Sequence, residues 1–158
     1  MSPSKVTTVD FGTYQNTVNG ELRGGKNVYH GINPSTKEEL WPVPVATTQD
    51  VEDAVKAANA AFPAWSRTPF EKRVEMIKKY QELYNGYEKE LTDLITKECG
   101  KPRQFAAFEI AGANAFFNHH CKLKMPEEVV EDDEKIITTR YTPLGVVAAI
   151  CPWNCEYR

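Results

Sequence analysis

The sequence has 158 residues, of which 41% are hydrophobic and 26% are charged. This mix is typical of a folded globular protein and excludes collagen-like and disordered chains. Because 19 basic and 22 acidic residues give a formal net charge of −3 without a concentrated basic face, we expect no nucleic-acid partner. No apolar run approaches the ~20 residues of a membrane span, and the N-terminus lacks the apolar stretch of a signal peptide. We therefore expect a cytoplasmic protein that does not associate with membranes.

The cysteines predict a reducing compartment and no metal centre. The sequence contains no Cys-x-x-Cys pair, and its four cysteines are Cys99, Cys121, Cys151 and Cys155. His119, His120 and Cys121 are adjacent on an expected helix. Three neighbours on a helix point in three directions and make a poor metal cage. We therefore expect no metal ligands in the chain.

Residues 1–45 are predicted to form short strands and turns. Asn19-Gly20 lies between two short runs that could pair, which favours a tight hairpin with positive φ at both turn positions. The segment Leu40–Val45 contains Pro42 and Pro44. Because proline cannot donate to a ladder, we expect this segment to be an edge strand or an extended crossing.

Residues 46–122 are predicted to form a cluster of three or four helices. Thr47 is expected to cap the first helix together with Asp50, and Pro63 is expected to end it.

The second helix has the clearest predicted start. Thr68 is expected to be its N-cap, with Pro69 at the first helical position and Glu71 completing a capping box. Its predicted apolar face consists of residues at helical spacing, namely Phe70, Val74, Ile77, Tyr80 and Tyr84.

Two further helices complete this cluster. The third is expected to follow a break at Asn85-Gly86 and to end at Gly100, and the fourth to run from Pro102 to about Lys122. Four phenylalanines are expected to pack between helices, namely Phe105, Phe108, Phe116 and Phe117.

The C-terminal part is predicted to contain an extended β arm and one buried strand. Residues 127–135 are rich in acids and are expected to be a solvated loop or strand margin, whereas 135–142 alternates as a half-exposed strand. Val146–Cys151 is a continuous apolar run, typical of a strand covered on both faces of a parallel sheet. Since this run has no parallel partner in the chain, we expect its apolar surface to be exposed or to be covered by another part of the fold. The fold class predicted for the whole chain is α/β.

Several motifs resemble one enzyme family. The run Pro143–Asn154 closely resembles the stretch that opens the coenzyme domain of NAD(P)-dependent aldehyde dehydrogenases. Three further segments stand in the order of that family, namely Asn33-Pro34-Ser35-Thr36, the helix end Ala57–Trp65, and Glu98–Pro102 with Glu109. From about residue 17 to residue 154 the chain resembles the N-terminal region of such an enzyme. Residues 146–154 would then begin an incomplete Rossmann-like coenzyme domain.

The resemblance implies a specific chemistry. Family members oxidise an aldehyde to a carboxylic acid through a thiolate nucleophile, with NAD or NADP accepting hydride. Asn154 matches the asparagine whose amide stabilises the developing oxyanion, a donor typically worth ~3–4 kcal/mol. Cys151, Pro152, Trp153 and Asn154 match one wall of the coenzyme site. On local sequence alone, an ordinary turn residue after a strand would be the better interpretation of Asn154.

The chain also departs from the family pattern. Asn154 is followed by Cys155-Glu156-Tyr157-Arg158 in place of an aromatic residue and a proline, and no residue matches the nucleophile or the base. Cys155 does not match the family's nucleophile, which arrives much later in the chain. We therefore expect a truncated N-terminal fragment, a pseudoenzyme that neither turns over nor binds NAD(P) alone.

Two other functions remain open. A non-catalytic interaction protein could dock on a full-length aldehyde dehydrogenase or associate with itself. An independent small helical domain is the third alternative, which the length and order of the matched segments disfavour.

Overall fold

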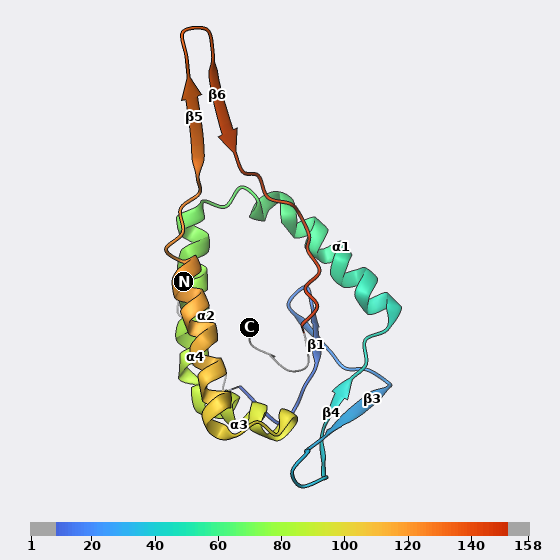
Figure 1. Cartoon of the computed structure of the whole chain (residues 1–158). Coiled ribbons are helices and arrows are strands. Elements are labelled where there is room, and N and C mark those ends of the chain that lie inside the picture. Colours follow the sequence, from blue (N-terminus) through green and yellow to red (C-terminus); the bar gives the residue numbers. More distant parts are fainter. Residues whose placement is uncertain (1–8, 152–158) are drawn as a thin grey trace, which may run out of the picture.

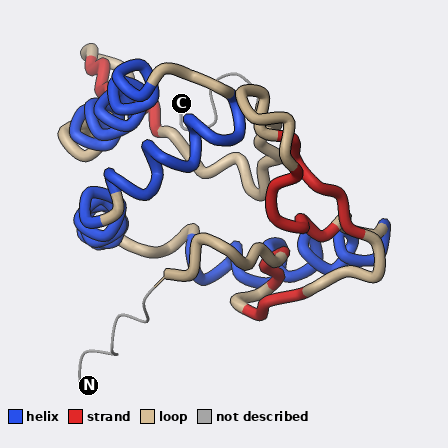
Figure 2. The backbone as a smooth tube through the Cα atoms, turned by 90° about the horizontal axis from the view of Figure 1, so that it is seen from below, coloured by secondary structure: helices blue, strands red, loops and turns tan. Residues whose placement is uncertain are grey.

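The computed structural model describes residues 9–151. Their elements follow one another around an open ring, from which one long hairpin projects (Figure 1 and Figure 2). In chain order the elements are β1 (Asn16–Val18), β2 (Glu21–Arg23), β3 (Val28–Ile32), β4 (Glu39–Pro44), α1 (Thr48–Trp65), α2 (Phe70–Gly86), α3 (Glu88–Cys99), α4 (Arg103–His120), β5 (Glu127–Glu131) and β6 (Ile136–Arg140). The described residues thus contain four helices and three two-stranded sheets, which confirms the expected mixture of helices and strands.

Two hairpins form the N-terminal part. Asn19 and Gly20 join β1 to β2 with φ values of 53° and 78°, which confirms the predicted tight turn. Strands β3 and β4 pair antiparallel, and Pro42 lies opposite His30. Because this sheet has two strands, β4 is an edge strand, as its prolines predicted.

Helix α1 begins as predicted and ends later than predicted. The Thr47 side chain accepts from the backbone N–H of Asp50, and the Asp50 side chain accepts from the backbone N–H of Thr47. The expectation that Pro63 ends the helix is wrong, because α1 continues to Trp65. A proline this near a C-terminus removes a single helical bond, and the backbone N–H of Ser66 still donates to the Phe62 carbonyl at 2.8 Å.

The predicted capping box at the start of α2 is wrong. Pro69 is the N-cap, and no side chain caps the helix. Thr68 instead belongs to the end of α1, since its backbone N–H donates to the Trp65 carbonyl at 3.0 Å. Its hydroxyl also donates back to the Ala64 carbonyl, at 3.4 Å. The short connection between α1 and α2 therefore uses Thr68 to close the first helix.

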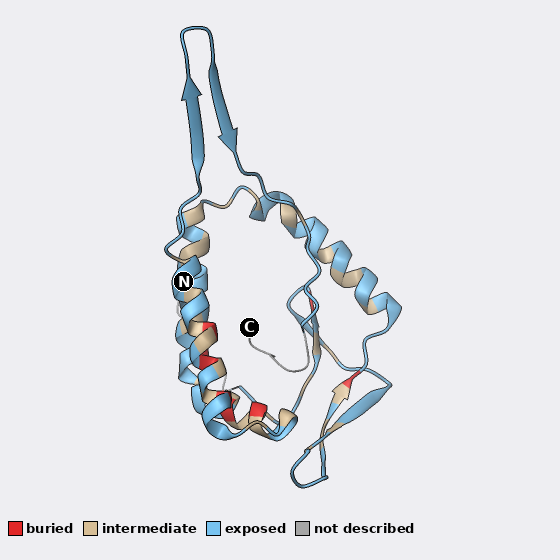
Figure 3. Cartoon of the chain, viewed as in Figure 1, coloured by how far each residue is buried: buried red, intermediate tan, exposed pale blue. Residues whose placement is uncertain are grey.

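The core lies among α2, α3 and α4 (Figure 3). It consists of Tyr84, Ile95, Ala106, Ile110 and Ala113, with Leu91, Cys99 and Phe117 packed against it. Helix α3 ends at Gly100 in the left-handed region, and α4 starts directly after Pro102, both close to prediction. Among the described residues no helix is long and apolar enough to cross a membrane.

The α4 phenylalanines are only partly buried, against prediction. Phe117 packs edge-on against Tyr84, with ring centroids 5.8 Å apart. Phe105, Phe108 and Phe116 remain 59%, 72% and 54% exposed. Helical spacing placed all four on α4 correctly, but α4 meets its neighbours along one side, so three of the rings face away from the core.

The C-terminal part contains one hairpin rather than an arm followed by a strand. Strand β5 carries the first of the acids and pairs antiparallel with β6, with Val130 opposite Ile137. The acidic run is thus solvated as expected, yet half of it is strand. The predicted strand Val146–Cys151 is not formed in this structure, because residues 141–151 form no strand. A parallel strand requires a neighbour, and no strand among the described residues pairs with this run.

Candidate functional site

The run that leads to the predicted coenzyme wall is exposed. Leu144 is 97% exposed and Ile150 is 96% exposed, and Cys151 is also exposed. The expectation that this apolar run would be exposed is confirmed. Pro152, Trp153 and Asn154, the other predicted site residues, lie outside the described residues.

Two distant sequence motifs meet at the end of α3. Gly100 lies so close to Pro34 that a Cβ atom added to the glycine would come within 2.6 Å of the proline Cγ. Gly100 also has a φ of 68°, a backbone conformation that residues with a side chain rarely adopt. The turn after α3 therefore requires glycine at position 100 for two reasons, its backbone conformation and its close contact with Pro34.

Asn33 shapes the loop that presents Pro34. Its side-chain oxygen accepts from the backbone N–H groups of Ser35 at 2.9 Å and Thr36 at 3.4 Å. Its backbone N–H donates to the Glu38 carbonyl at 2.9 Å, and its carbonyl accepts from Lys37 at 2.8 Å. These bonds close an Asx turn, which holds the β3–β4 loop in the form that contacts Gly100.

A largely buried ion pair follows the same turn. Lys101 pairs with Glu109 of α4, and their side chains are 23% and 8% exposed. Removing one member of such a pair leaves a buried charge without compensation. The pair therefore fixes the turn between α3 and α4, and its role is structural.

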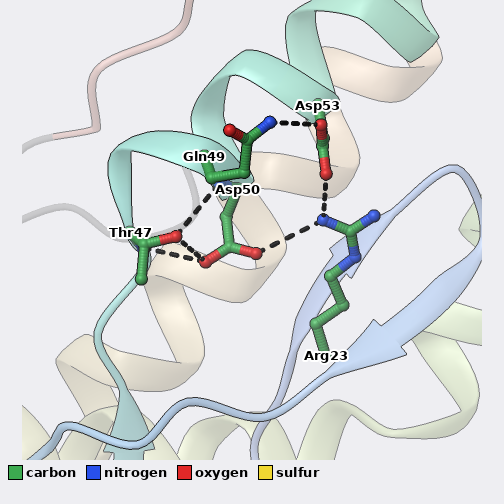
Figure 4. A network of polar contacts seen from close by, with 5 residues as sticks. All are labelled: Arg23, Thr47, Gln49, Asp50 and Asp53. Atoms are coloured by element: carbon green, nitrogen blue, oxygen red, sulfur yellow. Dashed lines mark hydrogen bonds and ion pairs between the residues drawn. The ribbon is translucent and has the colours of Figure 1, made fainter.

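A second polar network joins the first hairpin to α1 (Figure 4). Arg23 of β2 lies 2.8 Å from an oxygen of Asp53 and 3.3 Å from one of Asp50. Hydrogen bonds from Thr47, and then from Arg23, lower the pKa of Asp50. Arg23 is the main cause of the lowered pKa of Asp53, and Gln49 adds to it. The sequence motifs do not identify Arg23, because nothing local to the residue predicts that its partners lie on α1.

An apolar groove of about 680 Å³ lies between α2 and α4, beside the base of the β5–β6 hairpin. We call it the α2–α4 groove; its lining includes Arg73, Ile77, Phe116, His120, Cys121 and Tyr141. The sequence placed Ile77 on the core face of its helix. The groove escaped prediction because periodicity identifies an apolar face without showing what covers it. Within residues 9–151, no three His, Cys, Asp or Glu side chains gather as a metal site.

Comparison with known proteins identifies the arrangement. Residues 22–156 match the model of the aldehyde dehydrogenase family. The aldehyde dehydrogenase LUC3 of a Fusarium species is 43% identical over 146 residues, which are 92% of this chain and 32% of that protein. The chain belongs to the aldehyde dehydrogenase family. The motifs that meet at Gly100 lie within the matched residues.

Solved structures of aldehyde dehydrogenases share this fold. The methylmalonate-semialdehyde dehydrogenase of Oceanimonas doudoroffii superposes with a TM-score of 0.86 and 29% identity, covering 92% of this chain and 31% of that enzyme. An NADP-dependent enzyme of E. coli superposes with a TM-score of 0.71 and 25% identity, covering 76% of this chain and 26% of that one. The chain thus spans about a third of the length of the relatives it matches.

Proposed function

We propose that this chain is the N-terminal third of an NAD(P)-dependent aldehyde dehydrogenase. The observation that carries the proposal is the superposition of 92% of the chain on a methylmalonate-semialdehyde dehydrogenase with a TM-score of 0.86. The family match also extends through the Pro-Trp-Asn motif to residue 156. In this proposal residues 146–154 begin the coenzyme-binding sheet once the rest of such an enzyme lies beside them.

The chemical contribution of the chain is then an oxyanion donor. The side-chain amide of Asn154 donates a hydrogen bond to the aldehyde oxygen as negative charge develops on it. Cys151, Pro152 and Trp153 line one wall of the coenzyme site and orient the nicotinamide. NAD or NADP, when bound, accepts the hydride. The thiol nucleophile and the base belong to the remaining part of the family's length.

The isolated chain is proposed to be inactive. One wall offers few contacts against the ~4 kcal/mol or more that binding costs in lost translational and rotational freedom. A cytoplasmic location is part of the proposal and is supported by the free thiols of Cys121 and Cys151.

The experiment uses a fusion of this chain to the remaining part of the Oceanimonas enzyme, joined after Asn154, which lies within the residues that match the family. Asn154→Ala in the fusion is expected to lower kcat about 10²–10³-fold, because a preorganised donor is lost. Cys155 does not match the nucleophile, so a second fusion joined after Arg158 supplies the control Cys155→Ser, which is expected to leave kcat unchanged. Equal activity of the Asn154→Ala and parent fusions would remove Asn154 from the mechanism.

A second candidate is a non-catalytic interaction protein that docks on a full-length aldehyde dehydrogenase or on itself. The exposed hydrophobic residues of the β5–β6 hairpin favour it, namely Val129, Val130, Ile136 and Ile137. Size-exclusion chromatography with and without a full-length relative tests it. A monomer that never co-elutes with the relative would exclude this function.

A further inference from the structure

The α2–α4 groove is open to water although its walls are apolar. Ile77 of α2 is 42% exposed, Phe116 of α4 is 54% exposed, and Met125 on the way to β5 is 49% exposed. Each such side chain loses stabilisation of order 25 cal/mol per Å² of apolar surface left in water. Because the groove brings these residues together, binding of an apolar partner there would be favourable in free energy.

The charges of the groove are of one sign. The charged side chains that line it are Arg73 and Lys124, whereas no Asp or Glu among the described residues does. The Arg73 Nε is buried and has no hydrogen-bond partner, and its guanidinium carbon lies 5.7 Å from the centre of the Phe70 ring. A buried donor without an acceptor is costly, and an arginine is best satisfied by a carboxylate. The groove therefore fits an occupant that combines apolar side chains with an acidic one.

The length of the relatives indicates where such an occupant comes from. The chain aligns over 92% of its own length with the Oceanimonas enzyme but covers 31% of that enzyme. About two thirds of that polypeptide is therefore available to lie against the surfaces that are exposed in this structure. A second copy that docked groove to groove would place the same basic groups near each other.

We propose that the α2–α4 groove seats an apolar segment bearing an Asp or Glu, supplied by the remaining part of an aldehyde dehydrogenase polypeptide, with its carboxylate on Arg73. This inference rests on the proposed function, because that function supplies the remaining part. The interaction surface is thus the α2–α4 groove, and its positive charge at Arg73 selects an acidic residue of the occupant.

Cys121 reports on the occupancy of the groove, because it lines the groove and is partly exposed. Its alkylation by iodoacetamide is followed by peptide mass spectrometry in the isolated chain and in the fusion to the Oceanimonas enzyme. We expect alkylation about tenfold slower in the fusion, since access to the thiol is lost. Equal rates in a folded fusion would overturn the proposal. Slowing in the isolated chain as its concentration rises would also overturn it, in favour of a second copy.

Arg73→Gln tests the carboxylate, with Arg67→Gln as its matched control on an exposed arginine outside the groove. We expect Arg73→Gln to restore fast alkylation of Cys121 in the fusion and Arg67→Gln to leave it slow. If Arg73→Gln leaves Cys121 as protected as in the parent fusion, the proposed role of Arg73 is wrong.

A peptide scan decides the question if the fusion does not fold. Overlapping peptides of the remaining Oceanimonas sequence are added to the isolated chain, and an apolar peptide with an acidic residue is expected to slow Cys121 alkylation. Absence of any protecting peptide would then overturn the proposal.

The groove and the proposed function can fail separately. The proposed function fails if the fusion protects Cys121 and yet reduces no NAD(P). An active fusion with reactive Cys121 overturns the groove alone.

Discussion

Gly100 and Pro34 lie in contact at a place where only a hydrogen atom fits between the α3–α4 turn and the β3–β4 loop. Each belongs to a motif that resembles the aldehyde dehydrogenase family, and the two motifs are far apart in the sequence. The Asx turn at Asn33 shapes one side of this contact, and the left-handed turn at Gly100 forms the other.

Gly100→Ala is expected to lower the free energy of unfolding by at least 1–2 kcal/mol, which is the approximate cost of a left-handed residue with a Cβ. The close approach to Pro34 adds to that loss. Gly112→Ala is the matched control, because a Cβ there meets nothing within 4 Å, and alanine should stabilise the α4 helix by about 0.5–1 kcal/mol. Urea unfolding measures both. Equal stability of the two variants would contradict the contact.

The two threonines that precede helices should behave differently. Thr47→Ala is expected to cost about 1 kcal/mol, because it removes a side-chain cap. Thr68→Ala is expected to change stability by less than about 0.5 kcal/mol, because the Thr68 side chain does not cap α2 and makes one long hydrogen bond, of 3.4 Å, to α1. Thermal unfolding of the two variants measures both losses of stability. A larger loss for Thr68→Ala would restore the capping box predicted from sequence.

The Arg23 network should make stability depend on pH. Asp50 and Asp53 have lowered pKa values in the folded chain, below the ordinary value of 3.8. Their contribution is therefore present above the ordinary value and is lost as the pH falls through the folded values. We expect Arg23→Gln to reduce the difference in urea midpoint between about pH 6 and about pH 3. An unchanged difference would show that Arg23 contributes nothing to these pKa values.

Local signals in the sequence predicted most of the elements. The turn at Asn19-Gly20, the cap at Thr47 and the end of α3 at Gly100 depend on a few adjacent residues, so their patterns were sufficient. The prediction that Thr68 is an N-cap was wrong because a hydroxyl before a proline suits both the end of one helix and the start of the next. The short connection between the helices, which no pattern encodes, decided between them.

Features that depend on distant partners could not be predicted. The run Val146–Cys151 has the composition of a strand, but a strand also requires a neighbour. Likewise, helical spacing placed Ile77 on an apolar face without indicating that the face would border an open groove. The predicted site residues rested on the resemblance of the Pro-Trp-Asn motif alone, and three of the four lie outside the described residues.

The central claim is that this chain supplies the N-terminal third of an aldehyde dehydrogenase and is inactive without the rest. The most direct measurement is the reduction of NAD and NADP at 340 nm with methylmalonate semialdehyde, for the isolated chain and for its fusion to the remaining part of the Oceanimonas enzyme. We expect reduction by the fusion and none by the isolated chain. A folded fusion that reduces neither coenzyme, or turnover by the purified isolated chain, would contradict it.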